Sequence, residues 1–215
     1  LRRAIASITK LMTAVVVLEH ARLTDVVRVR ARSAGIGEST VYLRAGEELT
    51  VAELLRATLI PSANDAADAL ALHVGGGSID RFVDLMNATA QELGLSDTHF
   101  ENPHGLDESG HVSSARDATT LARYALGVPF IHDALQRSSY TRPGQTFPTT
   151  DDLLGSWAPL DGGKTGHTRD AGWSQAAAAS RAGVTVYGTV LGSDTRAARN
   201  DALRTLLTFG LDQYR

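Results

Sequence analysis

One segment near the start of the chain is apolar on almost every face of a helix. The apolar positions between residues 7 and 22 are Ile8, Leu11, Met12, Val15, Val16 and Leu18. A helix that is hydrophobic all round has no face to leave in water, so other elements must enclose it. The sequence therefore predicts a central helix. Ser7, Thr9 and Lys10 interrupt the apolar run and no small-residue cleavage site follows, so the segment is not a secretory signal.

The composition excludes several classes of protein. The 215 residues carry a formal net charge of -3, without the basic stripe that binding of nucleic-acid phosphates requires. Cysteine is absent, which excludes disulfides, thiolate catalysis and cysteine zinc sites. No apolar run reaches the roughly 18 to 20 residues that would span a bilayer, so we expect no transmembrane segment.

The remaining pattern predicts an α+β protein. A Thr-x-x-Glu capping box at Thr50 and Glu53 opens a helix that runs to Leu59. Further helices are expected at residues 63–74, 78–93, 114–126 and 198–214. Short strands or extended segments are expected at 26–30 and 40–46, and two longer strands at 172–180 and 184–192. Residues 98–114 and 138–160 are expected to be irregular. We predict a single domain over residues 1–215, with a helical lobe of about residues 23–150 and a sheet lobe made by the N-terminal helix and residues 160–215, separated by a cleft.

The first candidate motif is Ser7-Ile8-Thr9-Lys10 at the start of the central helix. A spacing of three residues places the hydroxyl of Ser7 and the amine of Lys10 on one helical face. A serine becomes a good nucleophile when a neighbouring base takes its proton, and a lysine whose pKa is lowered by burial and a second cation can be that base. A lone match is weak evidence, because Ser7 could instead cap the helix while Lys10 reaches solvent.

Two further motifs follow in the sequence. Ser62-Ala63-Asn64 comes after Pro61, where Ser62 could also be an ordinary helix cap. Lys164-Thr165-Gly166 leads into a strand, and its glycine allows close approach of the backbone to a ligand, although an exposed edge strand with a lysine is the plainer interpretation. The Gly-Lys-Thr run lacks the earlier glycine of a phosphate-binding loop. Three weak motifs in this order, each at an element boundary, favour a catalytic site.

This ordered set resembles the penicillin-recognising serine enzymes, and in particular the D-alanyl-D-alanine carboxypeptidases among the low-molecular-mass penicillin-binding proteins. Segments similar to that family run along the whole chain: "ASITKLMTA", "PSANDAADALA", "NPHGLDESGHVSSARD", "TTDDLL", "GGKTGHTRDAG" and "RNDALRTLLTFG". The resemblance implies a β-lactamase/transpeptidase-like fold, with an antiparallel sheet packed by helices, an all-helical lobe, and the active site between them.

The resemblance also implies a role for each motif residue. Ser7 would be the acylated nucleophile and Lys10 its base. Ser62 and Asn64 would relay a proton and contact the substrate amide, and Lys164 would complete the catalytic set. The substrate-binding residues would be Thr165, Gly166, His167 and Arg199. His167 would supply a backbone N–H to the oxyanion hole beside that of Ser7, and Arg199 would bind the terminal carboxylate, with Arg196 as the alternative.

Two departures from the family pattern bear on function. Family members carry two strands of the sheet, preceded by a signal peptide, ahead of the nucleophile, whereas Ser7 has six residues before it. We expect those strands to be supplied upstream, because a two-stranded hairpin is marginal alone. A class A β-lactamase would need Ser-Asp-Asn as its second motif and a glutamate deacylation loop. Neither is present, so rapid antibiotic hydrolysis is disfavoured.

The expected function is removal of the terminal D-alanine from peptidoglycan stem peptides through an acyl-enzyme on Ser7, with β-lactam antibiotics as covalent inhibitors. A D,D-transpeptidase and a non-catalytic, truncated peptidoglycan-binding relative are the alternatives. The resemblance implies an extracytoplasmic location. No cofactor is expected. His104 and His111 share a glycine-rich loop without a third ligand, so we expect no metal site.

Overall fold

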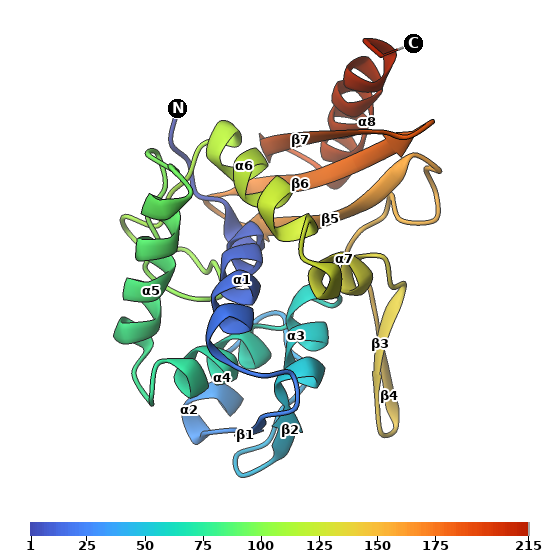
Figure 1. The fold of residues 1–215 in the computed structure, drawn as a ribbon. Coiled ribbons are helices and arrows are strands. Elements are labelled where there is room, and N and C mark those ends of the chain that lie inside the picture. The colour runs from blue at the N-terminus through green and yellow to red at the C-terminus, as the bar shows by residue number, and fades with distance from the viewer. Residues whose placement is uncertain (215) are drawn as a thin grey trace.

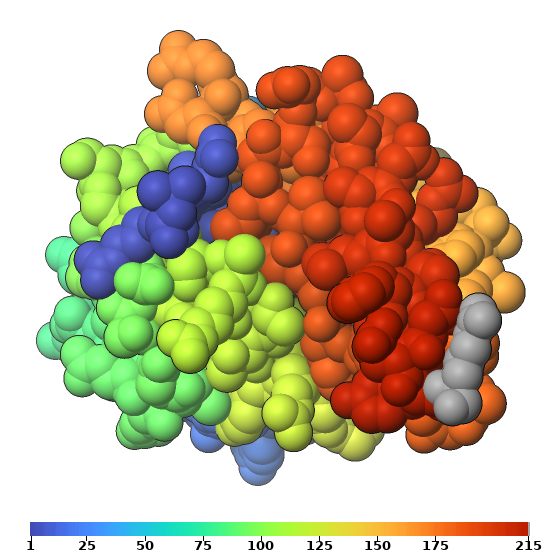
Figure 2. All heavy atoms as spheres, turned by 90° about the horizontal axis from the view of Figure 1, so that it is seen from above, coloured from blue at the N-terminus to red at the C-terminus, as the bar shows by residue number. Residues whose placement is uncertain are grey.

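The computed structural model describes residues 1–214 and contains the following elements (Figure 1). In chain order they are η1 (Ala6–Thr9), α1 (Lys10–His20), β1 (Val26–Arg28), α2 (Ala31–Ala34), β2 (Glu48–Thr50), α3 (Val51–Leu59), α4 (Asn64–Val74), α5 (Ile79–Glu92), α6 (Ala115–Leu126), α7 (Pro129–Leu135), β3 (Ser139–Arg142), β4 (Gln145–Pro148), β5 (Leu160–Thr168), β6 (Gly172–Arg181), β7 (Val184–Ser193) and α8 (Arg196–Asp212). The first residues lie on the surface, where Arg3 bridges to Ser113 (Figure 2).

The main sheet is antiparallel, with the strand order β5-β6-β7. Its central strand β6 is buried on both faces, and the alanines at its middle divide by strand alternation. Ala176 and Ala178 join the large core around α1, whereas Ala177 and Ala179 join a smaller core beneath α8. The sheet therefore lies between α8 on one side and the helices around α1 on the other (Figure 1).

The central position predicted for the N-terminal helix is confirmed. Helix α1 contacts α3, α4, α5 and α6, and its residues from Lys10 to Val17 are all buried. The helix begins with a turn of 3-10 helix, so Ser7 lies in η1 one turn ahead of α1 itself. The α+β class, the capping box at Thr50 and Glu53, and the two long C-terminal strands are also confirmed.

Several local predictions were wrong. Residues 40–46, expected as a short strand or an extended segment, do not form a strand: Tyr42 has a φ of 58°, which a strand cannot accommodate, and the partner of β1 is β2. Residues 138–160 are not all irregular, because β3 and β4 form a hairpin around Pro143 and Gly144. Helix α7 has no counterpart among the expected helices. The Lys-Thr-Gly motif lies inside β5, in a sheet of three strands where two were expected.

The turn that carries Ser7 is held in place by close packing against the loop before α6. Ala6 has a positive φ of 47°, and Gly105 lies against its carbonyl. A Cβ on Gly105 would lie 2.0 Å from the oxygen of Ala6, far inside van der Waals contact. Only glycine fits there, so the loop and the turn constrain each other.

We expect Gly105→Ala to lower the free energy of unfolding by about 3 kcal/mol or more, because the new methyl group would displace the turn. The matched control is Gly144→Ala. Gly144 has a φ of 77°, close to the 89° of Gly105, but a Cβ added there would meet no atom within 4 Å. The change at Gly144 should therefore lower the free energy of unfolding by only about 1 to 2 kcal/mol. Urea unfolding of both variants measures the difference, and equal losses would show that contact with Ala6 is unimportant.

Candidate active site

Ser7 and Lys10 are in direct contact. The Nζ atom of Lys10 lies 2.6 Å from Oγ of Ser7. The same nitrogen donates to Oδ1 of Asn64 and to the carbonyl oxygen of His104, each at 2.7 Å. Asn64 begins α4, and its Nδ2 donates to the carbonyl of Gly37 at 3.1 Å, which fixes the orientation of the amide. Lys10 is thus anchored by groups from three separate parts of the chain.

The environment of Lys10 favours its neutral form. The side chain is fully buried, and this burial, followed by the positive charge of Lys164, holds the pKa of Lys10 well below its usual range. A neutral amine carries a lone pair that can accept the proton of a hydroxyl group. The contact with Ser7 is therefore of the kind that turns a serine into a nucleophile.

Ser62 and Lys164 form a second hydroxyl–amine pair. Nζ of Lys164 donates to Oγ of Ser62 at 2.9 Å and to the carbonyl of Thr165 at 3.0 Å. Burial lowers the pKa of Lys164 to about 7, with Arg199 adding to the effect and Asp151 opposing it. Ser62 does not cap α4, because Ala63 occupies the cap position and Ser62 itself has a φ of 67°. Strained backbone of this kind is frequent at functional sites.

Strand β5 brings its Lys-Thr-Gly segment against the turn of Ser7. A Cβ on Gly166 would lie 2.8 Å from the carbonyl oxygen of Ile5 and 3.0 Å from the amide nitrogen of Ser7, so a side chain at this position is excluded. The hydroxyl of Thr165 lies 2.6 Å from that of Thr150. The absence of a side chain at residue 166 is what allows strand and turn to meet.

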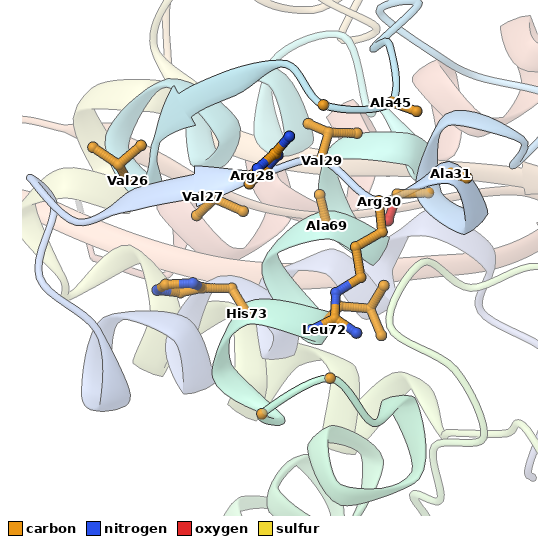
Figure 3. A pocket seen from close by; sticks show the side chains of 14 residues that line it. Val26, Val27, Arg28, Val29, Arg30, Ala31, Ala45, Ala69, Leu72 and His73 are labelled. Atoms are coloured by element: carbon orange, nitrogen blue, oxygen red, sulfur yellow. The ribbon is translucent and has the colours of Figure 1, made fainter.

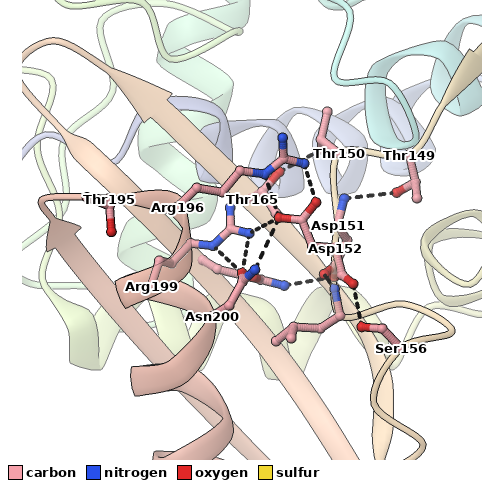
Figure 4. A network of polar contacts seen from close by, with 12 residues as sticks. Thr149, Thr150, Asp151, Asp152, Ser156, Thr165, Thr195, Arg196, Arg199 and Asn200 are labelled. Carbon is pink, nitrogen blue, oxygen red and sulfur yellow. Dashed lines mark hydrogen bonds and ion pairs between the residues drawn. The ribbon is translucent and has the colours of Figure 1, made fainter.

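The two candidate arginines differ in their accessibility. Arg199 is 1% exposed, and it donates to Asp152 at 3.2 Å and to Asn200 at 3.0 Å. The side chain of Arg196 is 49% exposed and forms a bidentate ion pair with the same carboxylate (Figure 4). Within the described residues, no hydrogen bond of Arg199 uses its Nη1 atom, which leaves that group for a ligand.

The motif residues converge on one cleft of about 210 Å³. Its lining residues are Ser7, Ser39, Ser62, Thr150, Thr165, Gly166, His167, Trp173, Arg196 and Arg199. The ring of His167 stacks on that of Trp173, with 4.0 Å between centroids, so this histidine side chain forms part of the outer wall. Lys10, Asn64 and Lys164 do not line the cleft but lie directly behind it, where they contact Ser7 and Ser62.

The histidines of the glycine-rich loop have structural contacts. His111 accepts from the amide of Glu101 through Nδ1, so Nε2 carries the proton and donates to Oγ1 of Thr9 at 2.7 Å. Burial lowers the pKa of His111 to about 4 and that of His104 to about 3, which keeps both neutral. Among residues 1–214, no group of three or more His, Asp or Glu side chains could hold a metal ion.

Several residues of this site carry no signal of their own in the sequence. Ser39, Thr150 and Trp173 line the cleft without belonging to a recognised motif. The segment "TTDDLL" resembles a family block but contains no motif residue. Its Thr150 contacts Thr165, and its Asp152 forms ion pairs with Arg196 and Arg199. Nothing in the residue spacing indicates these contacts, since they join segments far apart in the sequence.

The shifted pKa of Lys164 should make stability depend on pH. Its pKa of about 7 is below the usual 10.5, so between these values the unfolded chain binds more protons than the folded protein. The free energy of unfolding contributed by Lys164 therefore increases as pH rises from 7 towards 10. We expect Lys164→Met to show a smaller slope than the parent in urea unfolding at pH 7, 8 and 9. Identical slopes would contradict the low pKa.

Comparison with known proteins places this arrangement in a family. The model of the family described as D-alanyl-D-alanine carboxypeptidase matches residues 1–195. The D-alanyl-D-alanine carboxypeptidase DacF of Bacillus subtilis is 36% identical over 225 residues, which cover 99% of this chain and 57% of the relative. A D-alanyl-D-alanine carboxypeptidase of Streptomyces sp. strain K15 is 33% identical, covering 97% of this chain and 79% of the relative.

The fold is similar to solved structures as well. The crystal structure of the Streptomyces K15 DD-transpeptidase matches with a TM-score of 0.93 and 32% identity, covering 98% of this chain and 88% of that protein. The expected transpeptidase-like fold is therefore confirmed. The chain spans little more than half the length of several curated relatives, including those of B. subtilis and Escherichia coli. Because the family model matches most of its residues, the chain belongs to the D-alanyl-D-alanine carboxypeptidase family.

Proposed function

We propose that this protein is a serine-type D-alanyl-D-alanine carboxypeptidase that trims peptidoglycan stem peptides. The observation that carries the proposal is the 2.6 Å contact between Oγ of Ser7 and the buried amine of Lys10, at the centre of the cleft. Membership of the family supports the choice of substrate. The relatives' names supply the D-alanyl-D-alanine specificity.

The proposed reaction has two steps. Neutral Lys10 takes the proton of Ser7 as Oγ attacks the carbonyl carbon of the penultimate D-alanine, and the backbone N–H groups of Ser7 and His167 stabilise the oxyanion. A proton passes through Ser62, supported by Lys164, to the leaving nitrogen, so the peptide bond breaks and free D-alanine departs. Water then attacks the ester carbonyl of the acyl-enzyme, and Lys10 takes the proton of the water and passes it to Oγ of Ser7. The ester bond breaks, and the shortened peptide is released.

The edge of β5 and Nη1 of Arg199 bind the substrate. Thr165 and Arg199 bind the terminal carboxylate, where a charge-assisted hydrogen bond is roughly twice as strong as a neutral one. Asn64 holds Lys10 from behind the cleft, and Gly166 lets the peptide lie against the strand. Arg196 is the alternative carboxylate contact, since it lines the same cleft and is more exposed.

The same nucleophile is proposed to be acylated by β-lactams, whose strained amide presents a carbonyl and a carboxylate in similar positions. The proposed peptidoglycan substrate implies a location outside the cytoplasm. Within residues 1–214, no helix is long and apolar enough to cross a bilayer.

A second candidate is D,D-transpeptidation, in which an amine replaces water as the acceptor. The similarity to a protein described as a DD-transpeptidase favours it. Both reactions share the acyl-enzyme. The intact contact between Lys10 and Ser7 argues against a non-catalytic binding protein.

We expect Ser7→Ala to abolish both a covalent penicillin adduct and release of D-alanine, because it removes the hydroxyl paired with Lys10. Intact mass measurement after incubation with penicillin detects the adduct. The control is Ser78→Ala, which removes the cap of α5 away from the cleft and should leave the adduct in place. An adduct that persists in Ser7→Ala would refute the assignment.

We expect amidation of the terminal carboxylate of a D-Ala-D-Ala peptide to lower kcat/KM by about 100-fold in the parent, because the charge-assisted contacts are lost. The same comparison is made in Arg199→Ala and Arg196→Ala, and the variant that lacks the arginine bound to the carboxylate should show a much smaller effect of amidation. Thermal unfolding of each variant shows whether a change in kcat/KM comes from a lost contact or from loss of folded structure. If amidation costs the same in both variants as in the parent, neither arginine binds the carboxylate.

A further inference from the structure

A large groove lies away from the proposed catalytic cleft. It has a volume of about 950 Å³ and lies between β1 and the C-terminal end of α4 (Figure 3). None of its lining residues lines the cleft of Ser7. Its size is that of a ligand-binding pocket, and the proposed reaction assigns it no role.

One border of this groove is an unpaired strand edge. Strand β1 pairs with β2 alone, in a sheet of two strands. The amide of Val29 donates to Glu47, and the carbonyl of Asp25 accepts from Val51, so the odd-numbered residues direct their backbone groups towards β2. The N–H and C=O groups of Val26 and Arg28 therefore point to the opposite side. No strand of the described chain pairs with them there.

The side chains of the groove separate into an apolar set and a basic set. Val27, Val29 and Leu72 are buried and form apolar walls, whereas Val26 is 58% exposed. Arg28 and Arg30 alternate with the buried valines along the chain. A strand added at this edge would therefore lie within reach of both buried apolar side chains and guanidinium groups.

Neither arginine is neutralised by the protein. Among the described residues, Arg28 and Arg30 form no ion pair, although Glu48 is the cross-strand partner of Arg28. The guanidinium of Arg30 extends past Leu72 to the glycine turn after α4 (Figure 3), where it lies 2.8 Å from the position of a Cβ on Gly77. Glycine at this turn leaves room for the arginine inside the groove.

We propose that this groove binds an extended segment of a partner protein that carries acidic side chains at alternate positions and adds to β1 as a third strand. The free backbone groups of Val26 and Arg28 supply the main-chain hydrogen bonds, the mode in which a sheet edge recognises a peptide. Arg28 and Arg30 select Asp or Glu at alternate positions, and Val27, Val29 and Leu72 take the apolar residues between. The proposal is independent of the catalytic assignment.

The test uses two fluorescein-labelled peptides, Gly-Glu-Val-Glu-Val-Glu-amide and its counterpart with lysine in place of each glutamate. Fluorescence anisotropy should show saturable binding of the glutamate peptide, about tenfold or more tighter than the lysine peptide and weaker at high salt. Val26→Pro should weaken it about tenfold, because proline removes an outward N–H and leaves the pairing with β2 intact. The rate of penicillin labelling should not change.

Charge reversal tests the role of the two arginines even if Val26→Pro fails to fold. The double variant Arg28→Glu, Arg30→Glu should prefer the lysine peptide, whereas Arg123→Glu, at an exposed position on α6, should behave as the parent. Equal binding of the two peptides by the parent, or no saturation by either at about 1 mM, overturns the proposal. A concentration-dependent dimer that the double variant abolishes would identify a second copy of the chain as the occupant and also overturn it.

Discussion

The burial of two lysine side chains is the constraint on which the rest of the site depends. Lys10 and Lys164 are almost entirely inaccessible, and removing an ammonium group from water costs several kcal/mol unless the group is neutralised or surrounded by acceptors. Both outcomes occur here: burial lowers each pKa, and each nitrogen has oxygen acceptors within 3.0 Å. The two contacts with chemical consequence are those with the hydroxyls of Ser7 and Ser62. The cost of burial is thus what makes a basic amine available beside each serine.

Buried lysines need rigid surroundings that keep them away from water, and the core around α1 provides this rigidity. Lys10 is on the first turn of a helix with buried residues on every side, so its nitrogen cannot withdraw to solvent. Gly105 and Gly166 allow a loop and a strand to approach the turn of Ser7 more closely than any other residue would permit. The positive φ values of Ala6 and Ser62 lie next to or within the two motifs, and the same packing holds them. Strain and buried charge are therefore concentrated where acyl transfer would occur.

The sequence predicts the elements whose signals are local and continuous. The all-round apolar pattern of α1, the capping box of α3 and the alanine-rich strand β6 each follow from neighbouring residues. The short strand β2 and the hairpin β3–β4 were missed because three or four residues carry too little periodicity, although Pro143-Gly144 is a turn signal that could have been used. In the site, the pairing of Ser7 with Lys10 follows from helical spacing. The contact of Lys164 with Ser62, by contrast, joins residues 102 positions apart, and only the family resemblance indicates it from the sequence.

The position of Asp152 explains why carboxylate recognition could not be settled from sequence. Its carboxylate accepts hydrogen bonds from Arg196, Arg199 and Asn200. Its single negative charge offsets one of the two arginine charges, and its contacts orient both side chains. The buried Arg199 loses little conformational entropy when it binds an anion, whereas the half-exposed Arg196 must first leave the carboxylate that holds it. A preorganised donor contributes more to affinity than a mobile one with the same charge. Preorganisation therefore favours Nη1 of Arg199 as the principal contact for the carboxylate of the proposed substrate and leaves Arg196 as an outer group, held over Trp173 at the mouth of the cleft.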